Sequence, residues 1–325
     1  MKRLTTRTVQ RLMICAGLFF TGSLHAAWPA DQPIKLIVPQ AAGGTNDTVA
    51  RIVAVELGKA LGQTIIIDNR PGASGAIGML AVAQAKADGY TLGLASDSAA
   101  LLDITRPARS WKFRQDLQGV GMIGDQPISI AVSAKTPYQT LADVVKAAKA
   151  RPGEIAYGTS GVGSSQHVIG EWLAKLAQAQ VIHVPYKGGG QAITDLISGQ
   201  VSVAVLGLAP MLVQEKAGNV RIIAVTTPKR DPSVPKVPTL SELGYPQISL
   251  AQWAGVVAPA ATAPEIVKRL SNAIQKVLAS PSVKRQLTEA GVSPAPMDNV
   301  RFSEFLRTNV DMWSALVPSL NLKLE

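Results

Sequence analysis

Short apolar runs alternate with helical stretches from residue 34 to residue 226, and turns rich in Gly and Pro separate them. This alternation restricts the fold most strongly, because strand–helix–strand units place successive strands in largely parallel sheets. The predicted strands are Ile34–Val38, Thr64–Asp68, Thr91–Ala95, Ile128–Val132, Ile155–Tyr157, Val181–Val184, Val201–Leu206 and Val220–Thr226. The predicted helices are Asn46–Leu61, Gly75–Ala87, Leu141–Ala150, Ser164–Ala177, Gln191–Ser198 and Pro210–Ala217. An extended segment, Ile248–Ala258, then leads into helices Pro264–Leu278, Ser282–Ala290 and Phe302–Leu316.

The pattern restarts near residue 128, which indicates two similar α/β domains in a chain of 325 residues. Three helices follow the long extended segment, which suggests that the chain returns to the first domain. We therefore expect residues 27–127 and 254–325 to form domain 1 and residues 128–253 to form domain 2. A cleft between two such domains is the expected ligand site.

Residues 1–26 have the features of an export signal. Basic residues come first, an apolar run of nine residues (Leu12–Phe20) follows, and small residues surround Ala26. This run is about half the length that a membrane-spanning helix needs. We therefore expect cleavage near Ala26/Ala27 and a periplasmic mature protein.

Removal of this signal excludes several classes of function. Cys15 lies inside it, so the mature chain has no disulfide, thiolate nucleophile or cysteine-based zinc site. The formal net charge falls from +10 to +6 and no long basic cluster remains, so nucleic-acid binding is not expected. The two remaining histidines, His167 and His183, make a weak case for a metal, and we interpret both as structural.

The most informative segment joins the first predicted strand to the first predicted helix. Ligands gather at the carboxyl ends of parallel strands, and a helix start offers free N–H groups that suit an anion. Glycines there let the backbone approach a ligand, although a plain strand-to-helix turn with a cap would also explain these residues. The candidate site residues in this segment are Gln40, Ala42, Gly43, Gly44, Thr45, Asn46 and Asp47.

A second glycine-rich segment repeats this arrangement after the strand Ile155–Tyr157. Two such loops facing each other could hold a carboxylate between two helix starts. Asp97 follows a third strand and could reach the same cleft, although an Asx turn or helix cap would also explain it. The candidate residues of the second segment are Ser160, Gly161, Gly163, Ser164 and Ser165.

Enzyme motifs fail near these loops. Gln166 replaces the third glycine of a dinucleotide fingerprint, and Val162 replaces the last glycine of a nucleophile elbow. The lysine of Lys187-Gly188-Gly189-Gly190 stands on the wrong side for a Walker loop. We therefore expect no cofactor and no catalytic residues, and we interpret Trp253 as domain packing.

Many motifs in order resemble one known family. They include Pro-x-x-x-Gly-Gly-x-x-Asp-x-x-Ala-Arg (39–51), Asn-Arg-Pro-Gly-Ala-x-Gly (69–75), Asp-Gly-Tyr-Thr (88–91), Tyr-Gly-x-Ser-Gly-x-Gly-Ser (157–164), His-Val-Pro-Tyr-Lys-Gly (183–188), Val-Pro-Thr-Leu (237–240) and Trp-x-Gly (253–255). The chain resembles the extracytoplasmic solute receptors of the tripartite tricarboxylate transporter group, the TctC-like Bug receptors. The resemblance implies a two-domain periplasmic binding protein fold that closes on a small carboxylate. It also implies that backbone N–H groups and waters hold the carboxylate without a salt bridge, and that inner-membrane transporter subunits are the partners.

Three positions depart from the family pattern. Gln40 replaces a frequent aromatic residue, Asp97 stands where Asn is common, and an apolar stretch from Leu206 to Ala209 replaces a polar one. By analogy with the family, the far end of the ligand meets Ser96, Asp97 and Ser98 on one side and Gly207 and Ala209 on the other. These residues favour a monocarboxylate or an amino-acid-like ligand over a tricarboxylate.

Two other functions remain open at this point. The chain could present its ligand to a membrane signalling protein instead of a transporter, or it could be an exported α/β hydrolase. We expect a monomer that works as a transport receptor.

Overall fold

The computed structural model describes residues 28–322 except residue 109, so the predicted export signal lies outside the described residues. The strands are β1 (Ile34–Val38), β2 (Ile65–Asn69), β3 (Thr91–Ser96), β4 (Leu117–Ser133), β5 (Ala156–Thr159), β6 (Ile182–Pro185), β7 (Val203–Gly207), β8 (Val220–Val225), β9 (Ala251–Pro259) and β10 (Ser293–Met297). The helices are α1 (Thr45–Leu61), the 3₁₀ turn η1 (Ala73–Gly75), α2 (Ala76–Ala83), α3 (Asp97–Thr105), α4 (Phe113–Asp116), α5 (Leu141–Ala150), α6 (Ser165–Ala177), α7 (Gly189–Ser198), α8 (Leu208–Lys216), α9 (Pro264–Ala279), α10 (Pro281–Glu289) and α11 (Asn299–Ser319). Among them, no helix is both long and apolar enough to cross a bilayer.

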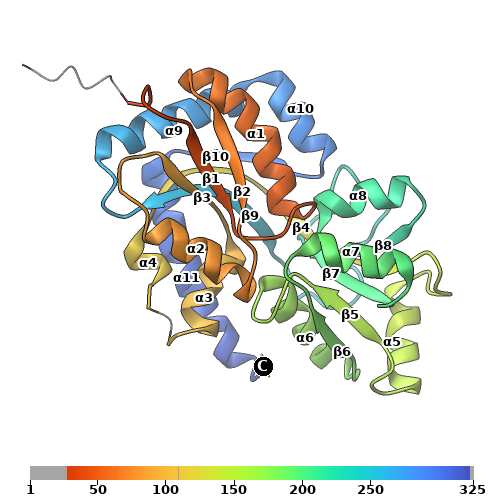
Figure 1. Ribbon diagram of the computed structural model, residues 1–325. Coiled ribbons are helices and arrows are strands. Elements are labelled where there is room, and N and C mark those ends of the chain that lie inside the picture. Colours follow the sequence, from red (N-terminus) through yellow and green to blue (C-terminus); the bar gives the residue numbers. More distant parts are fainter. Residues whose placement is uncertain (1–27, 109, 323–325) are drawn as a thin grey trace, which may run out of the picture.

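The strands follow the order β2-β1-β3-β9-β4-β7-β5-β6, with β8 and β10 also paired to β4. The outer strands are parallel, as predicted: β1 to β2 and β3, and β5 to β6 and β7. The prediction of largely parallel sheets is wrong for β4 and β9, which run antiparallel to each other and to their other partners. Figure 1 shows these two long strands between a half that contains β1–β3 and a half that contains β5–β7.

Helices cover both faces of each half, because strands buried on both sides need two apolar layers. In the first half, Leu36 and Leu94 pack with α1 and α9 on one face, while Ile37 packs with α2 and α11 on the other. In the second half, Ile130 and Val205 pack with α5 and α6, while Leu206 packs with α7 and α8. The domain boundaries given above stay a prediction.

Strand β4 begins eleven residues before the predicted Ile128–Val132 segment. Its first part contains Gly119, Gly121 and Gly124, which weaken a strand pattern and resemble a loop in the sequence. In the structure these glycines allow close packing: a Cβ on Gly124 would lie 2.4 Å from the Ser293 carbonyl oxygen of β10. Packing between distant segments therefore explains the missed part of the strand.

The remaining predicted elements agree with the structure to within a few residues. The structure also contains three elements that were not predicted from the sequence: α3, α4 and β10. Trp253 is buried, donates from Nε1 to Asn309 Oδ1 at 3.0 Å, and packs edge-on against Phe302. Its predicted packing role is confirmed.

Candidate functional site

The glycine-rich start of α1 meets the start of α7 from the other half of the sheet. The Ala41 N–H donates to the Lys187 carbonyl oxygen at 3.3 Å. A Cβ on Gly44 would lie 3.4 Å from the Gly189 backbone nitrogen. The first predicted loop is therefore packed against a segment, 187–190, that the sequence analysis leaves out of the site.

The second predicted loop meets the start of α3. Ser165 N–H donates to Ser98 Oγ at 3.3 Å, and the hydroxyl oxygens of these serines lie 3.2 Å apart. The hydroxyl of Ser74, which follows β2, donates to the Val162 carbonyl oxygen. Both glycine-rich loops thus lie along the boundary between the two halves.

The starts of α1 and α8 complete this boundary. Gly207 is the residue before α8, and a Cβ there would lie 2.3 Å from Thr45 Oγ1 and 3.0 Å from Gln252 Oε1. A larger residue at position 207 would therefore displace the Thr45 side chain. The predicted residues Thr45 and Gly207 are therefore direct neighbours.

Four helices, α1, α3, α7 and α8, begin at this boundary after N-cap residues that make no side-chain cap bond among the described residues. These N-caps are Gly44, Ser96, Gly188 and Gly207. By contrast, the hydroxyl of Ser164 caps α6 by accepting from His167 N–H. The positive ends of four helix dipoles are therefore concentrated here, which favours a bound anion, while Ser98 N–H of α3 already donates to Asp97 Oδ1 and Ala209 N–H of α8 to Gln126 Oε1.

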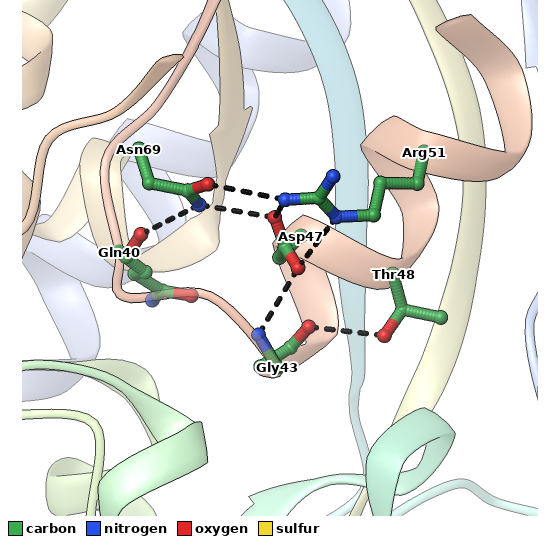
Figure 2. A network of polar contacts seen from close by, with 7 residues as sticks. Gln40, Gly43, Asp47, Thr48, Arg51 and Asn69 are labelled. Carbon is green, nitrogen blue, oxygen red and sulfur yellow. Dashed lines mark hydrogen bonds and ion pairs between the residues drawn. The ribbon is translucent and has the colours of Figure 1, made fainter. Parts of the chain in front are cut away.

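Asp47 holds the first loop in position rather than leaving its carboxylate free (Figure 2). Its oxygens accept from Gly43 N–H at 3.0 Å, from Arg51 Nε and Nη2 at 2.9 Å each, and from Asn69 Nδ2 at 3.0 Å. Asn69 also donates to the Gln40 carbonyl oxygen. Burial alone would raise the pKa of Asp47, but the hydrogen bonds and the charge of Arg51 lower it below its usual value. This network ties the loop to α1 and to the end of β2.

Three buried polar atoms near the boundary have no hydrogen-bond partner among the described residues: Asn46 Oδ1, Asp97 Oδ2 and Gln252 Nε2. Each residue is 1% exposed or less. Burial raises the pKa of Asp97 to about 7, although Ser165 and the N–H of Ser98 partly oppose this. Two acceptor oxygens and one donor nitrogen are therefore available where four helices begin.

The predicted site residues divide by exposure and by role. All are buried except Ala42 and Gly43. Ala209 lies in the core of the first half, and its N–H donates to Gln126 Oε1 at 3.0 Å. Gln126 and Gln252 are missed by the sequence analysis, and the only signal is a polar residue within a buried central strand. Binding by any of these residues stays a prediction.

His167 and His183 lie next to the second glycine-rich loop and bond to it and to the strand before it. Their rings stack with centroids 3.7 Å apart. His167 Nδ1 accepts from Gly163 N–H at 3.0 Å, and His183 Nε2 lies 2.7 Å from Thr159 Oγ1. Burial lowers the pKa of His167 to about 3, with a contribution from His183, and burial lowers that of His183 to about 4. Both rings are neutral at neutral pH, which fits the predicted structural role.

Two α/β halves joined by long central strands, with helix starts lining the boundary, define the class of periplasmic solute-binding proteins. The chain belongs to the TctC family, described as the tripartite tricarboxylate transporter family receptor, whose sequence profile matches residues 49–322. Protein BugT of Bordetella pertussis (strain Tohama I) is 34% identical over 97% of this chain and 99% of its own.

Solved structures give the same result. The periplasmic binding protein BugD has a TM-score of 0.87 at 27% identity, covering 90% of this chain and 99% of that one. Rpa4515 of R. palustris with adipate has a TM-score of 0.86 at 32% identity, covering 90% and 98%. MatC of Rhodopseudomonas palustris with malate has a TM-score of 0.83 at 27% identity, covering 89% and 99%. The predicted family and fold class are confirmed.

Proposed function

We propose that this chain captures a small organic carboxylate at the boundary between its halves and delivers it to a tripartite transporter. The observation that carries the proposal is the meeting of four helix starts, whose N-cap side chains make no cap bond, around buried, unpartnered polar atoms. Among the described residues, no lysine or arginine is buried. Backbone N–H groups can nevertheless hold a carboxylate, since each hydrogen bond to a charged group contributes about 1.5–3 kcal/mol.

The comparisons support this ligand class. Relatives of the same fold and family hold malate and adipate, both small carboxylates. Family membership also favours a receptor over a hydrolase. Recovery of an unchanged carboxylate after incubation would support the receptor, and turnover would support the hydrolase.

We further propose that the ligand is a monocarboxylate or resembles an amino acid. An ammonium or hydroxyl group of the ligand would donate to the free Asp97 Oδ2, and an ammonium would lower the pKa of Asp97 and keep it ionised, a form that repels a second carboxylate. Gly207 and Ala209, at the start of α8, add no donor side chain for another anion. Tight binding of citrate at neutral pH, measured by calorimetry, would contradict this ligand class.

The proposal places the mature protein in the periplasm as a monomer, after cleavage near Ala26/Ala27. Its partners are then the inner-membrane subunits of the transporter. A sensor would use the same ligand-bound form, and capture of a membrane signalling protein in place of transporter subunits would favour that second function.

A thermal-shift screen with mono- and dicarboxylates, amino acids and aromatic acids tests the function. A ligand at about 100 times its Kd should add about 2.7 kcal/mol of stability. No stabilisation by any carboxylate would contradict the proposal.

A further inference from the structure

Gln252 is a buried polar residue in the central strand β9. It is 1% exposed, and its register partner across the sheet is Gln126 of β4. A buried amide without partners is costly, so such a residue in an apolar sheet calls for a function. One end of this amide has a partner and the other does not.

Neighbouring side chains engage one end of the Gln252 amide. Its Oε1 accepts from Gln166 Nε2 at 3.2 Å, and Gln166 Oε1 in turn accepts from Ser160 Oγ at 2.8 Å. This chain of hydrogen bonds begins in the second predicted loop and ends at β9. In this arrangement the NH₂ end of Gln252 has no partner among the described residues.

The free Nε2 belongs to the boundary already described. Gln252 Oε1 lies 3.0 Å from the position that a Cβ of Gly207 would take, and Thr45 Oγ1 lies 2.3 Å from the same position. Gln252 is therefore next to the starts of α8 and α1, while Gln166 belongs to α6. The side chain therefore neighbours two of the four helix starts that we propose to bind the ligand, those of α1 and α8.

We propose that Gln252 is a specificity-determining residue that donates an N–H from Nε2 to an oxygen of the bound carboxylate. This inference rests on the proposed function. A neutral amide donor favours an oxygen acceptor and disfavours an ammonium group at the same place. Gln166 and Ser160 are positioning residues, because their chain of hydrogen bonds engages the acceptor end of the amide and leaves Nε2 for the ligand.

Calorimetry on two variants of the full mature chain tests this role. Gln252→Met keeps the length of the side chain and removes the donor, whereas Gln252→Glu keeps its shape and replaces the donor with a negative charge. The probes are propionate, L-lactate and L-alanine, which differ only at C2, together with succinate, malate and adipate. Gln118→Met is the matched control. Gln118 lies near the start of β4, away from Gln126, and donates to the Pro259, Ala260 and Thr262 carbonyls.

We expect Gln252→Met to weaken the best probe about tenfold and Gln252→Glu about a hundredfold, with Gln118→Met unchanged. Gln252→Glu should also shift the preference between L-lactate and L-alanine toward L-alanine, a change that a merely structural role would not produce. An unchanged Kd for both Gln252 variants, with or without a lower Tm, would overturn the inference while leaving the proposed function intact. If the wild-type protein binds none of the six probes, the proposed function is contradicted and, with it, this inference.

Discussion

Gly44 should control whether the two halves can close on a ligand. Its backbone is extended, with φ −88° and ψ 176°, so a β-branched residue fits there without backbone strain. A Cβ at this position would already lie 3.4 Å from the Gly189 nitrogen and 3.7 Å from its Cα. The two γ-methyl groups of valine would extend about one bond length further toward the start of α7.

Gly44→Val should therefore leave each half folded and penalise the closed arrangement. Overpacking of a close contact costs about 1–3 kcal/mol, which corresponds to a loss of affinity of about 5- to 150-fold. Gly44→Ala adds only the Cβ and is the matched control, with an expected loss below about threefold.

Calorimetry with the best ligand of the carboxylate screen measures these losses, and circular dichroism checks the fold. A Kd for Gly44→Val within about twofold of wild type would refute the argument. It would show that the starts of α1 and α7 do not need to meet for binding.

Three further predictions follow from charge and export. Burial raises the pKa of Asp97 to about 7, so the folded state retains a proton that the unfolded chain releases near pH 4. The free energy of unfolding should therefore fall as the pH rises between about 4 and 7. Urea unfolding of Asp97→Asn should lack this fall, and an equal pH dependence of the unfolding free energy in wild type and variant would refute the argument. Asp47→Asn should lower the free energy of unfolding by about 1–3 kcal/mol at pH 7, because the carboxylate accepts from Arg51, Gly43 and Asn69. Since hydrogen bonds lower the pKa of Asp47, this difference should shrink only below about pH 4, and a difference that stays the same as the pH falls further would contradict the assignment. Protein recovered from the periplasm should lack Met1–Ala26, and an intact mass that retains Met1 would exclude cleavage.

The sequence predicts most of the fold because periodicity and glycine-rich turns are local signals. The predicted strand is shorter than β4, because Gly119, Gly121 and Gly124 weaken the strand pattern and their packing partners lie far away in the chain. Only the three-dimensional structure shows that β4 and β9 are antiparallel and join the two halves.

The candidate site is predicted less completely. Strand–glycine–helix segments mark the starts of α1 and α6, but before α7 the sequence shows only a failed nucleotide motif and a family motif (183–188) to which no site role was assigned. Gln252 is a single polar residue whose free amide depends on Gln166, 86 positions earlier in the chain. Asp47 is a predicted site residue whose partner Arg51 stands one helical turn away, a spacing that favours an ion pair. The ion pair between Asp47 and Arg51 could thus be predicted from the sequence, whereas the bonds of Asp47 to Gly43 and Asn69 could not.

A crystal structure of the mature protein with its best carboxylate ligand tests the central claim most directly. The account predicts that the carboxylate oxygens lie within about 2.7–3.2 Å of backbone N–H groups at the helix starts along the boundary, with Gln252 Nε2 on a ligand oxygen. A ligand bound elsewhere, or a carboxylate paired with a lysine or arginine side chain, would contradict it.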